Sequence, residues 1–176
     1  MKEFHIHVSE LKEYIPQLTV GDRVLLSGTV YTSRDAAHQR IFERMENDQP
    51  LPYPIQDAVI YYAGPTPTPD GRPIGSCGPT TSSRMDPYTP KLHDLGLMAT
   101  IGKGARSKEV CASIQRNQAV YFCALGGAGA LAAQCISEAE VIAFEDLGCE
   151  SVKRLTLKNF PLTVAIDSFG HSIFDR

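Results

Sequence analysis

The stretch "DRVLLSGTVYTSRDAAHQRIFERMEND", residues 22–48, changes its hydrophobic periodicity once, and that change indicates the fold class. Residues 22–32 are β-branched and aliphatic, which predicts a strand, and Ser27–Gly28 within them predicts a bulge or a close backbone approach. From Ser33, a plausible N-cap, the pattern becomes that of an amphipathic helix. Its apolar positions recur at Ala37, Ile41 and Met45. A strand that leads directly into a helix is typical of an α/β protein.

The alternation continues along the chain. Further strands are expected at 57–64, 97–102, 119–125 and 139–144, and further helices at 82–96, 107–117 and 127–136. The proline- and glycine-rich segment 65–79 reads as an ordered loop, because regular elements resume on both sides of it. The tail carries two strand-like runs divided by Asn159–Phe160–Pro161. This pattern predicts an α/β fold with a mixed sheet and flanking helices.

The composition sets broad limits on function. The 176 residues are 43% hydrophobic, enough for one compact domain spanning residues 1–176. With 17 basic against 20 acidic residues and a net charge of -3, no bulk attraction to nucleic acid or to an anionic membrane is expected. No long apolar segment is present, so we expect a cytoplasmic protein without a membrane anchor.

The five cysteines are an odd number and lie at least 12 residues apart, without C-x-x-C spacing. This pattern argues against a disulfide framework and against a metal or iron-sulfur site built from this chain alone. Cys111, Cys123 and Cys135 lie among apolar residues and are expected to be buried free thiols. Cys77 precedes a Gly-Pro pair; reactivity and packing are both open for it, and packing is favoured.

"GPTTSSRMD", residues 78–86, gathers hydroxyls and one arginine at an expected helix start. Unpaired N–H groups at a helix start attract anions, and hydroxyls there cap the helix or help to hold the anion. Arg84 adds a fork of donors suited to a carboxylate. Thr81 is expected to serve as a cap. A capped helix with a surface arginine remains the alternative.

Two other strand ends carry a cation. Arg34 follows the strand at 22–32, and Lys103 lies between two glycines after the strand at 97–102. Each alone is compatible with a solvated surface residue, but ligands bind at the carboxyl ends of strands in α/β sheets. Together with Arg84 they predict a pocket for a small dianion. His38 lies on the same helix face as Arg34, where it is expected to be a structural histidine.

A competing motif begins at Gly127. Gly127-x-Gly129-x-x-Ala132 follows a strand and opens a helix, and Glu145 ends the next strand, which fits a loose dinucleotide-binding fingerprint. The fingerprint is weak, because the helix is short and few residues follow Glu145. A nucleotide- or anion-binding regulatory module is kept as an alternative function. The other interpretation is that the glycines only allow the helix to pack tightly.

The combination of five motifs resembles the β subunit, or C-terminal domain, of the class I iron-sulfur hydro-lyases, which include class I fumarases and L-tartrate dehydratases. The motifs are "SGTVYTSRDAAH" (27–38), "YYAGP" (61–65), "GPTTSSRMD" (78–86), "IGKG" (101–104) and "GGAGAL" (126–131). The resemblance implies a swivelling β/β/α domain that closes over a [4Fe-4S] cluster held by a separate α subunit or N-terminal domain.

The resemblance also implies roles for single residues. Arg34, Arg84 and Lys103 match cationic carboxylate-binding positions, and Thr80 matches the hydroxyl residue proposed as the catalytic base. The expected function is reversible hydration of fumarate to malate in an α2β2-type heteromer with an iron-sulfur α subunit. Tartrate dehydration is the alternative within the class, because both substrates present a pair of carboxylates.

Overall fold

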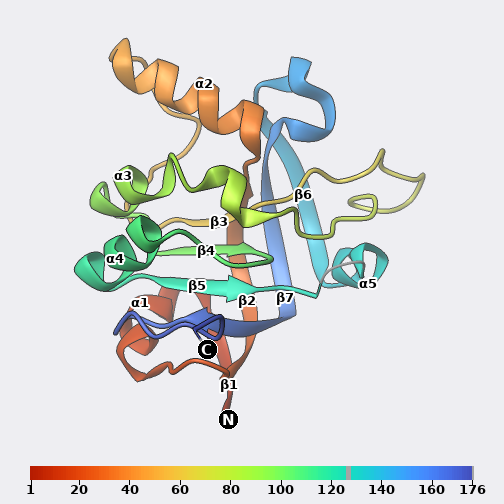
Figure 1. The fold of residues 1–176 in the computed structure, drawn as a ribbon. Coiled ribbons are helices and arrows are strands. Elements are labelled where there is room, and N and C mark those ends of the chain that lie inside the picture. The colour runs from red at the N-terminus through yellow and green to blue at the C-terminus, as the bar shows by residue number, and fades with distance from the viewer. Residues whose placement is uncertain (126–127, 176) are drawn as a thin grey trace.

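The computed structural model describes residues 1–125 and 128–175, which form a mixed α/β structure (Figure 1). The strands are β1 (Glu3–His7), β2 (Arg23–Thr32), β3 (Val59–Tyr61), β4 (Ala99–Gly102), β5 (Val120–Cys123), β6 (Ile136–Ala143) and β7 (Val152–Ile166). The α-helices are α1 (Leu11–Tyr14), α2 (Asp35–Glu46), α3 (Thr89–Asp94), α4 (Lys108–Asn117) and α5 (Gly129–Gln134). Short 3-10 helices are η1 (Val8–Glu10), η2 (Ile15–Gln17), η3 (Ser82–Met85) and η4 (Glu145–Glu150).

Five strands close into a small barrel. β2, β3, β4 and β5 pair in parallel in that order, and β7 pairs antiparallel with both β5 and β2, which completes the ring. β1 extends β2 in parallel, and β6 extends β7 antiparallel. The expected mixed sheet with flanking helices is therefore confirmed, and the carboxyl ends of β2, β3 and β4 point to one edge.

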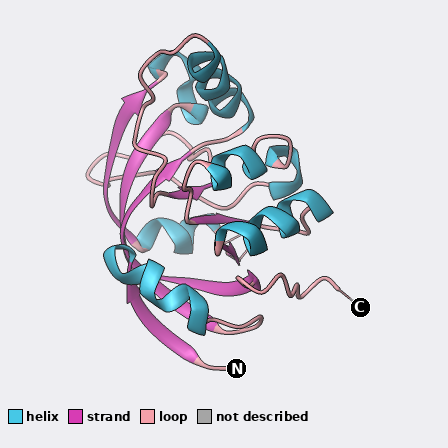
Figure 2. Cartoon of the chain, turned by 90° about the vertical axis from the view of Figure 1, so that its left-hand side faces the viewer, coloured by secondary structure: helices cyan, strands magenta, loops and turns pink. Residues whose placement is uncertain are grey.

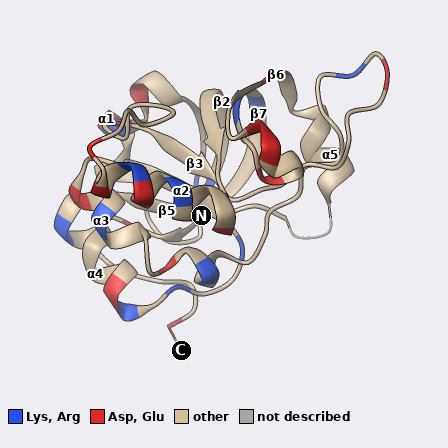
Figure 3. Cartoon of the chain, turned by 90° about the horizontal axis from the view of Figure 1, so that it is seen from above, with Lys and Arg blue, Asp and Glu red and all other residues tan. Residues whose placement is uncertain are grey.

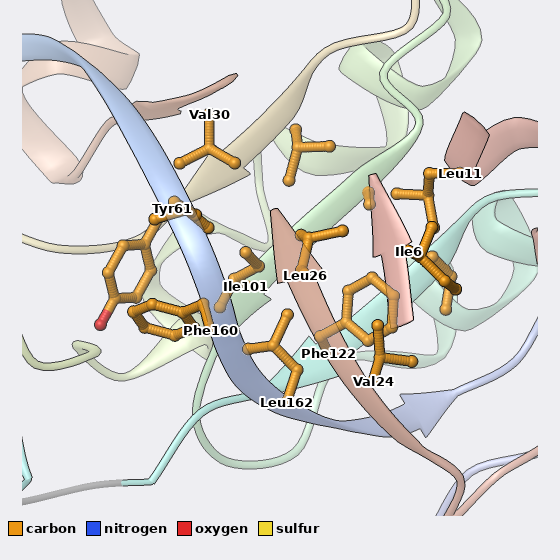
Figure 4. Packing of buried hydrophobic residues seen from close by; sticks show 14 of the residues in the cluster. Ile6, Leu11, Val24, Leu26, Val30, Tyr61, Ile101, Phe122, Phe160 and Leu162 are labelled. Carbon is orange, nitrogen blue, oxygen red and sulfur yellow. The ribbon is translucent and has the colours of Figure 1, made fainter. Parts of the chain in front are cut away.

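The barrel closes around an apolar core. Side chains alternate between buried and more exposed positions along β2, as expected for a strand with one face inward. Figure 4 shows the buried side chains of the five barrel strands meeting between them. Tyr61 and Phe160 contact edge to face, with ring centroids 5.4 Å apart, a geometry that stabilises aromatic pairs beyond their buried area.

Most helices lie on one side of the strands (Figure 2). The apolar stripe of α2 packs through Ala37 and Ile41 into a second cluster that includes Ile60, Tyr62 and Met85. Residues of β3 therefore contribute to both clusters, which ties the helical layer to the barrel. The amphipathic pattern predicted for this helix is confirmed, although its N-cap is Arg34 and not Ser33.

The C-terminal strand corrects one expectation. β7 runs without a break from Val152 to Ile166, where two runs divided at Asn159–Pro161 were expected. Asn159 adopts φ +49°, its N–H donates to Ser27 Oγ at 2.9 Å, and the register with β2 shifts between Leu26 and Gly28. Lys158 and Asn159 oppose the single residue Ser27, so the extra residue lies in β7, and a bulge there absorbs the irregular residues. At Ser27–Gly28 the close approach, and not a bulge of β2, is confirmed, because a Cβ on Gly28 would lie 3.0 Å from His7 Cε1.

Other differences lie at the edges of the fold. β1 was not expected, and β6 begins at Ile136, where the expected helix 127–136 was still continuing. The segment 65–79 is a loop, as expected. The Thr66 N–H donates to the Ser76 carbonyl and the Ser76 N–H donates to Thr66 Oγ1, which joins the two ends of the loop. Basic and acidic residues are interspersed along the helices (Figure 3). Among the described helices, none has the length and apolar character needed to cross a membrane.

Candidate functional site

Three segments meet at the carboxyl ends of β2, β3 and β4. Arg34 follows β2 and is the N-cap of α2. The Thr80 N–H donates to the Tyr62 carbonyl at 2.7 Å, which joins the 78–86 stretch to the end of β3. Beyond β4, Lys103 pairs in parallel with Thr81, and its carbonyl accepts from the Ser82 N–H at 3.0 Å. The structure therefore brings together the segments that carry all four predicted residues.

Gly102 allows this close approach. A Cβ on Gly102 would lie 1.9 Å from Ser82 Oγ and 2.9 Å from Tyr62 Cδ2, closer than packed atoms tolerate. The 78–86 stretch can therefore lie against β4 only because residue 102 has no side chain.

We expect Gly102→Ala to displace this stretch and to lower the free energy of unfolding by about 1 to 3 kcal/mol, the usual cost of overpacking. Chemical denaturation measures the change. Gly78→Ala is the matched control, because its Cβ would meet nothing closer than 3.4 Å. Equal stability of the two variants would contradict this account of the site.

Thr80 and Arg84 are in direct contact. An Arg84 Nη2 N–H, from within η3, donates to the Oγ1 of Thr80, which lies two residues before that helix begins. The Thr80 side chain is part-buried, whereas the Arg84 side chain is 49% exposed. A guanidinium that donates to a hydroxyl oxygen favours the anionic form of that oxygen. This contact therefore matches the chemistry required of a threonine that accepts a proton.

The expected contribution of a helix start is corrected. η3 is a 3-10 helix of four residues, and the Thr80 and Ser82 N–H groups are bonded to the carbonyls of Tyr62 and Lys103. Thr81 is the N-cap, but its side chain makes no capping hydrogen bond. Cations, and not these two backbone N–H groups, are therefore left to attract an anion here.

The three cations differ in their surroundings. Arg34 Nη2 lies 3.8 Å from Asp35 Oδ2, and Arg34 Nε lies 3.7 Å from Glu150 Oε1. Arg84 Nε lies 3.4 Å from Asp35 Oδ1. Lys103 is exposed and forms no ion pair with any residue in the described part of the chain. Asp35 and Glu150 are components of the site that the sequence analysis did not predict.

A buried polar network, which local sequence patterns did not predict, holds the segments of the site together. The Arg106 side chain is fully buried; its Nε donates to Asp86 Oδ1 at 2.6 Å, and its Nη2 donates to Thr89 Oγ1 at 2.9 Å. The Tyr121 hydroxyl bonds to Ser82 Oγ at 2.8 Å and to the Gly104 carbonyl at 2.8 Å. These bonds join the loop after β4 to η3 and fix their relative position.

A signal for this network was present in the strands. Tyr62 and Tyr121 lie in otherwise apolar segments, and a buried tyrosine hydroxyl requires a polar partner. Arg106 meets that need for Tyr62, with Nη2 donating to its hydroxyl at 3.2 Å, and its guanidinium lies over both rings. The two tyrosines in apolar segments were thus a signal that a buried hydrogen-bond donor lies nearby.

His38 is structural, as expected. It is fully buried, and its Nδ1 lies 2.9 Å from both Ser33 Oγ and the Arg34 carbonyl. Burial lowers the pKa of its imidazole to about 4, so the ring is neutral at neutral pH. His38 therefore adds no charge to the site and instead supports the backbone at Arg34.

The cysteines lie in different environments. Cys77 is fully buried, and burial raises its pKa to about 12, so packing is its role and reactivity is not supported. Cys111, Cys123 and Cys135 are half-buried, a weaker burial than expected, and Cys149 is exposed. Among the described residues no group of three or more His, Cys, Asp or Glu side chains is arranged to hold a metal. The described residues of this chain therefore offer no set of donors that fits an iron-sulfur cluster.

The dinucleotide fingerprint lacks its expected context. Gly127 lies outside the described residues, and β6 pairs antiparallel with β7 instead of parallel with β5, whereas the dinucleotide fold needs a parallel β-α-β unit. A Cβ on Gly129 would lie 2.3 Å from Ser76 Oγ and 3.0 Å from the Gly78 nitrogen. Gly129 therefore serves close packing against the segment that leads into Thr80.

The sequence of this chain is similar to those of known proteins. The family model described as "Fumarase C-terminus" matches residues 1–176. Fumarate hydratase 2 of Leishmania major is 37% identical over 171 residues, which cover 96% of this chain and 30% of that protein. The aerobic class I fumarate hydratase of Escherichia coli K12 is also 37% identical over 171 residues, covering 94% of this chain and 31% of its own length.

A third relative is close to this chain in length. The putative L(+)-tartrate dehydratase subunit beta of Methanocaldococcus jannaschii is 38% identical over 171 residues, which cover 94% of this chain and 88% of that protein. The chain thus spans about a third of the fumarate hydratases and most of a separate β subunit. It belongs to the fumarase C-terminus family, whose members here are class I fumarate hydratases and a tartrate dehydratase β subunit.

Proposed function

We propose that residues 1–176 act as one unit, the dicarboxylate-binding β subunit of a hydro-lyase that reversibly hydrates fumarate to malate. The observation that supports this most strongly is the contact of the Arg84 guanidinium with the Thr80 hydroxyl, at an edge that also carries Arg34 and Lys103. Cations at that edge suit two carboxylates, and a hydroxyl bonded to a cation suits proton removal.

In the dehydration direction, a proton leaves the carbon next to one carboxylate and hydroxide leaves the neighbouring carbon with its electron pair. We assign the proton to Thr80 Oγ1, which accepts it as an alkoxide, after its own hydroxyl proton has left to solvent, and so becomes a neutral hydroxyl. The negative charge that builds up spreads onto the oxygens of the adjacent carboxylate, where Arg84 and Lys103 stabilise it. Arg34 binds and orients the second carboxylate. In the hydration direction Thr80 returns the proton.

The resemblance assigns departure of the hydroxide to a [4Fe-4S] cluster, and we place that cluster on a partner. This chain offers no set of ligands for it among its described residues. We therefore infer an iron-sulfur α subunit, in a cytoplasmic α2β2-type heteromer. The site of this chain would then form one wall of a catalytic centre shared by the two subunits.

L-Tartrate dehydration is the second candidate. It is favoured by the relative that is itself a β subunit of nearly the same length. Tartrate presents the same pair of carboxylates and differs in its hydroxyls, and none of the residues assigned above distinguishes the two substrates. A nucleotide-binding regulatory module is disfavoured, because the fingerprint lacks a parallel β-α-β unit.

Reconstitution tests the proposal. The purified chain is assayed for fumarate hydration and L-tartrate dehydration, alone and after anaerobic mixing with an iron-loaded α subunit of this family. We expect no turnover by the chain alone and fumarate hydration by the mixture. Faster turnover of tartrate would select the second candidate. Turnover by the chain alone, or a stable complex that acts on neither substrate, would contradict the proposal.

A further inference from the structure

A carboxylate of the chain lies between two of the site's arginines. Asp35 is the first residue of α2, directly after Arg34. Its Oδ2 lies 3.8 Å from Arg34 Nη2, and its Oδ1 lies 3.4 Å from Arg84 Nε. One carboxyl group therefore lies within ion-pair distance of two cations that are fifty positions apart in the sequence.

The contacts of Asp35 depend on charge and not on hydrogen bonds. Its carboxylate accepts no hydrogen bond from any residue that the structure describes, and its side chain is 42% exposed. Exposed ion pairs without hydrogen bonds are weak, whereas a ligand carboxylate can accept two parallel N–H bonds from a guanidinium. A ligand carboxylate can therefore replace Asp35 beside the arginines with better geometry.

The charge balance supports the same conclusion. Arg34, Arg84 and Lys103 supply three positive charges, and Asp35 and Glu150 lie within ion-pair distance of the two arginines. Arg34 Nε and Glu150 Oε1 are both buried, lie 3.7 Å apart and have no hydrogen-bond partner among the described residues. With both carboxylates in place, the site's positive charge is too small to match a dianion.

Resting on the proposed function, we propose that Asp35 is an internal counter-ion, which screens Arg34 and Arg84 in the empty site and is displaced by a substrate carboxylate. Asp35 then limits affinity for dianions while it keeps the empty site from holding two uncompensated arginines. It is a specificity-determining residue and not a catalytic one, because it touches the arginines and not the reacting atoms.

Asp35→Asn tests the proposal, since it keeps the shape and removes the charge. The probes are fumarate and crotonate, in which a methyl group replaces one carboxylate. We expect the variant to bind fumarate about 1.5- to 5-fold more tightly, the size expected for one exposed ion pair. Crotonate should gain less, because its single charge feels half the repulsion of a dianion.

Asp146→Asn is the matched control. Asp146 pairs with Arg40, which is also on α2, with Arg40 Nη1 2.7 Å from Asp146 Oδ1. The control thus makes the same substitution and releases an arginine of the same helix, but it leaves the contacts of Arg34 and Arg84 intact. Its affinity for fumarate should match that of the wild type.

Two readouts separate the possible outcomes. Dissociation constants come from NMR titration of the isotope-labelled full chain, and KM and kcat come from the reconstituted enzyme. We expect KM for fumarate to fall and kcat to change little, since Asp35 affects binding and not the proton transfer. Damage to the fold cannot produce tighter binding, so this result would not have a purely structural explanation.

Weaker or unchanged fumarate binding in Asp35→Asn would overturn the proposal, because Asp35 would then orient the arginines or do nothing. Failure of wild type and variant alike to bind fumarate would also overturn it. A different result would contradict the proposed function alone. In that case the chain would show the expected binding pattern, but its complex would turn over neither fumarate nor tartrate. Asp35 would then be a counter-ion in a protein without hydro-lyase activity.

Discussion

Replacing Thr80 with valine should lower turnover of the reconstituted enzyme by about 100- to 10,000-fold, the range expected when a general acid-base group is lost. Valine keeps the shape of the side chain and removes the oxygen that accepts the Arg84 N–H. Affinity for fumarate should change less, because the cations remain. Steady-state rates and KM values measure both effects.

Two neighbouring substitutions serve as controls. Thr80→Ser should keep part of the rate, since it retains the oxygen and loses the methyl group that restricts its rotamer. Thr81→Val should keep nearly all of it, because the Thr81 side chain is exposed and makes no capping bond. Near wild-type turnover by Thr80→Val would assign the proton to a residue of the partner.

Substituting alanine for Arg34, Arg84 or Lys103 should weaken dicarboxylate binding by about 30- to 3,000-fold each, which corresponds to about 2 to 5 kcal/mol for removing one partner of a desolvated charge pair. Arg34, Arg84 and Lys103 are at least partly exposed in this chain. A loss of affinity in that range is therefore expected only when substrate and the partner subunit cover the site. Calorimetric titration of the assembled enzyme with fumarate measures the loss.

The two arginines should differ in kcat. Arg84→Ala should lower kcat as well as affinity, because Arg84 also donates to Thr80 Oγ1. Arg34→Ala should act mainly on affinity, since none of its contacts involves Thr80. Arg40→Ala is the control: it removes the same charge from α2, where Arg40 pairs with Asp146. Normal binding by all three site variants would refute the dianion pocket.

Local patterns predicted the parts of the site that follow strands. Arg34 and Lys103 could be placed because parallel strands end at one edge of a sheet, and the strands before them have clear apolar patterns. Thr80 and Arg84 were harder to place from local pattern, since a long loop separates them from β3. The hydrogen bond from Thr80 N–H to the Tyr62 carbonyl, which joins them to that strand, has no local signature.

The features that local patterns missed depend on contacts between distant segments. In the sequence, Asp35 is an ordinary acidic residue in the first turn of a helix. Only the fold brings Arg84 beside it. Arg106 reads as a loop cation, yet two tyrosines, Asp86 and Thr89 enclose it. The continuity of β7 through Pro161 likewise depends on its pairing with β2, which continues on both sides of the bulge that β7 forms at Lys158 and Asn159.

The central claim, that Thr80 takes the proton, is tested most directly by a deuterium isotope effect. Dehydration of malate that carries deuterium at the carbon losing the proton is compared with unlabelled malate, in wild type, Thr80→Val and Thr81→Val enzymes. Loss of the base raises the barrier of proton removal alone, so this account predicts a larger isotope effect in Thr80→Val than in the other two. A slow Thr80→Val enzyme whose isotope effect equals that of the wild type would contradict it.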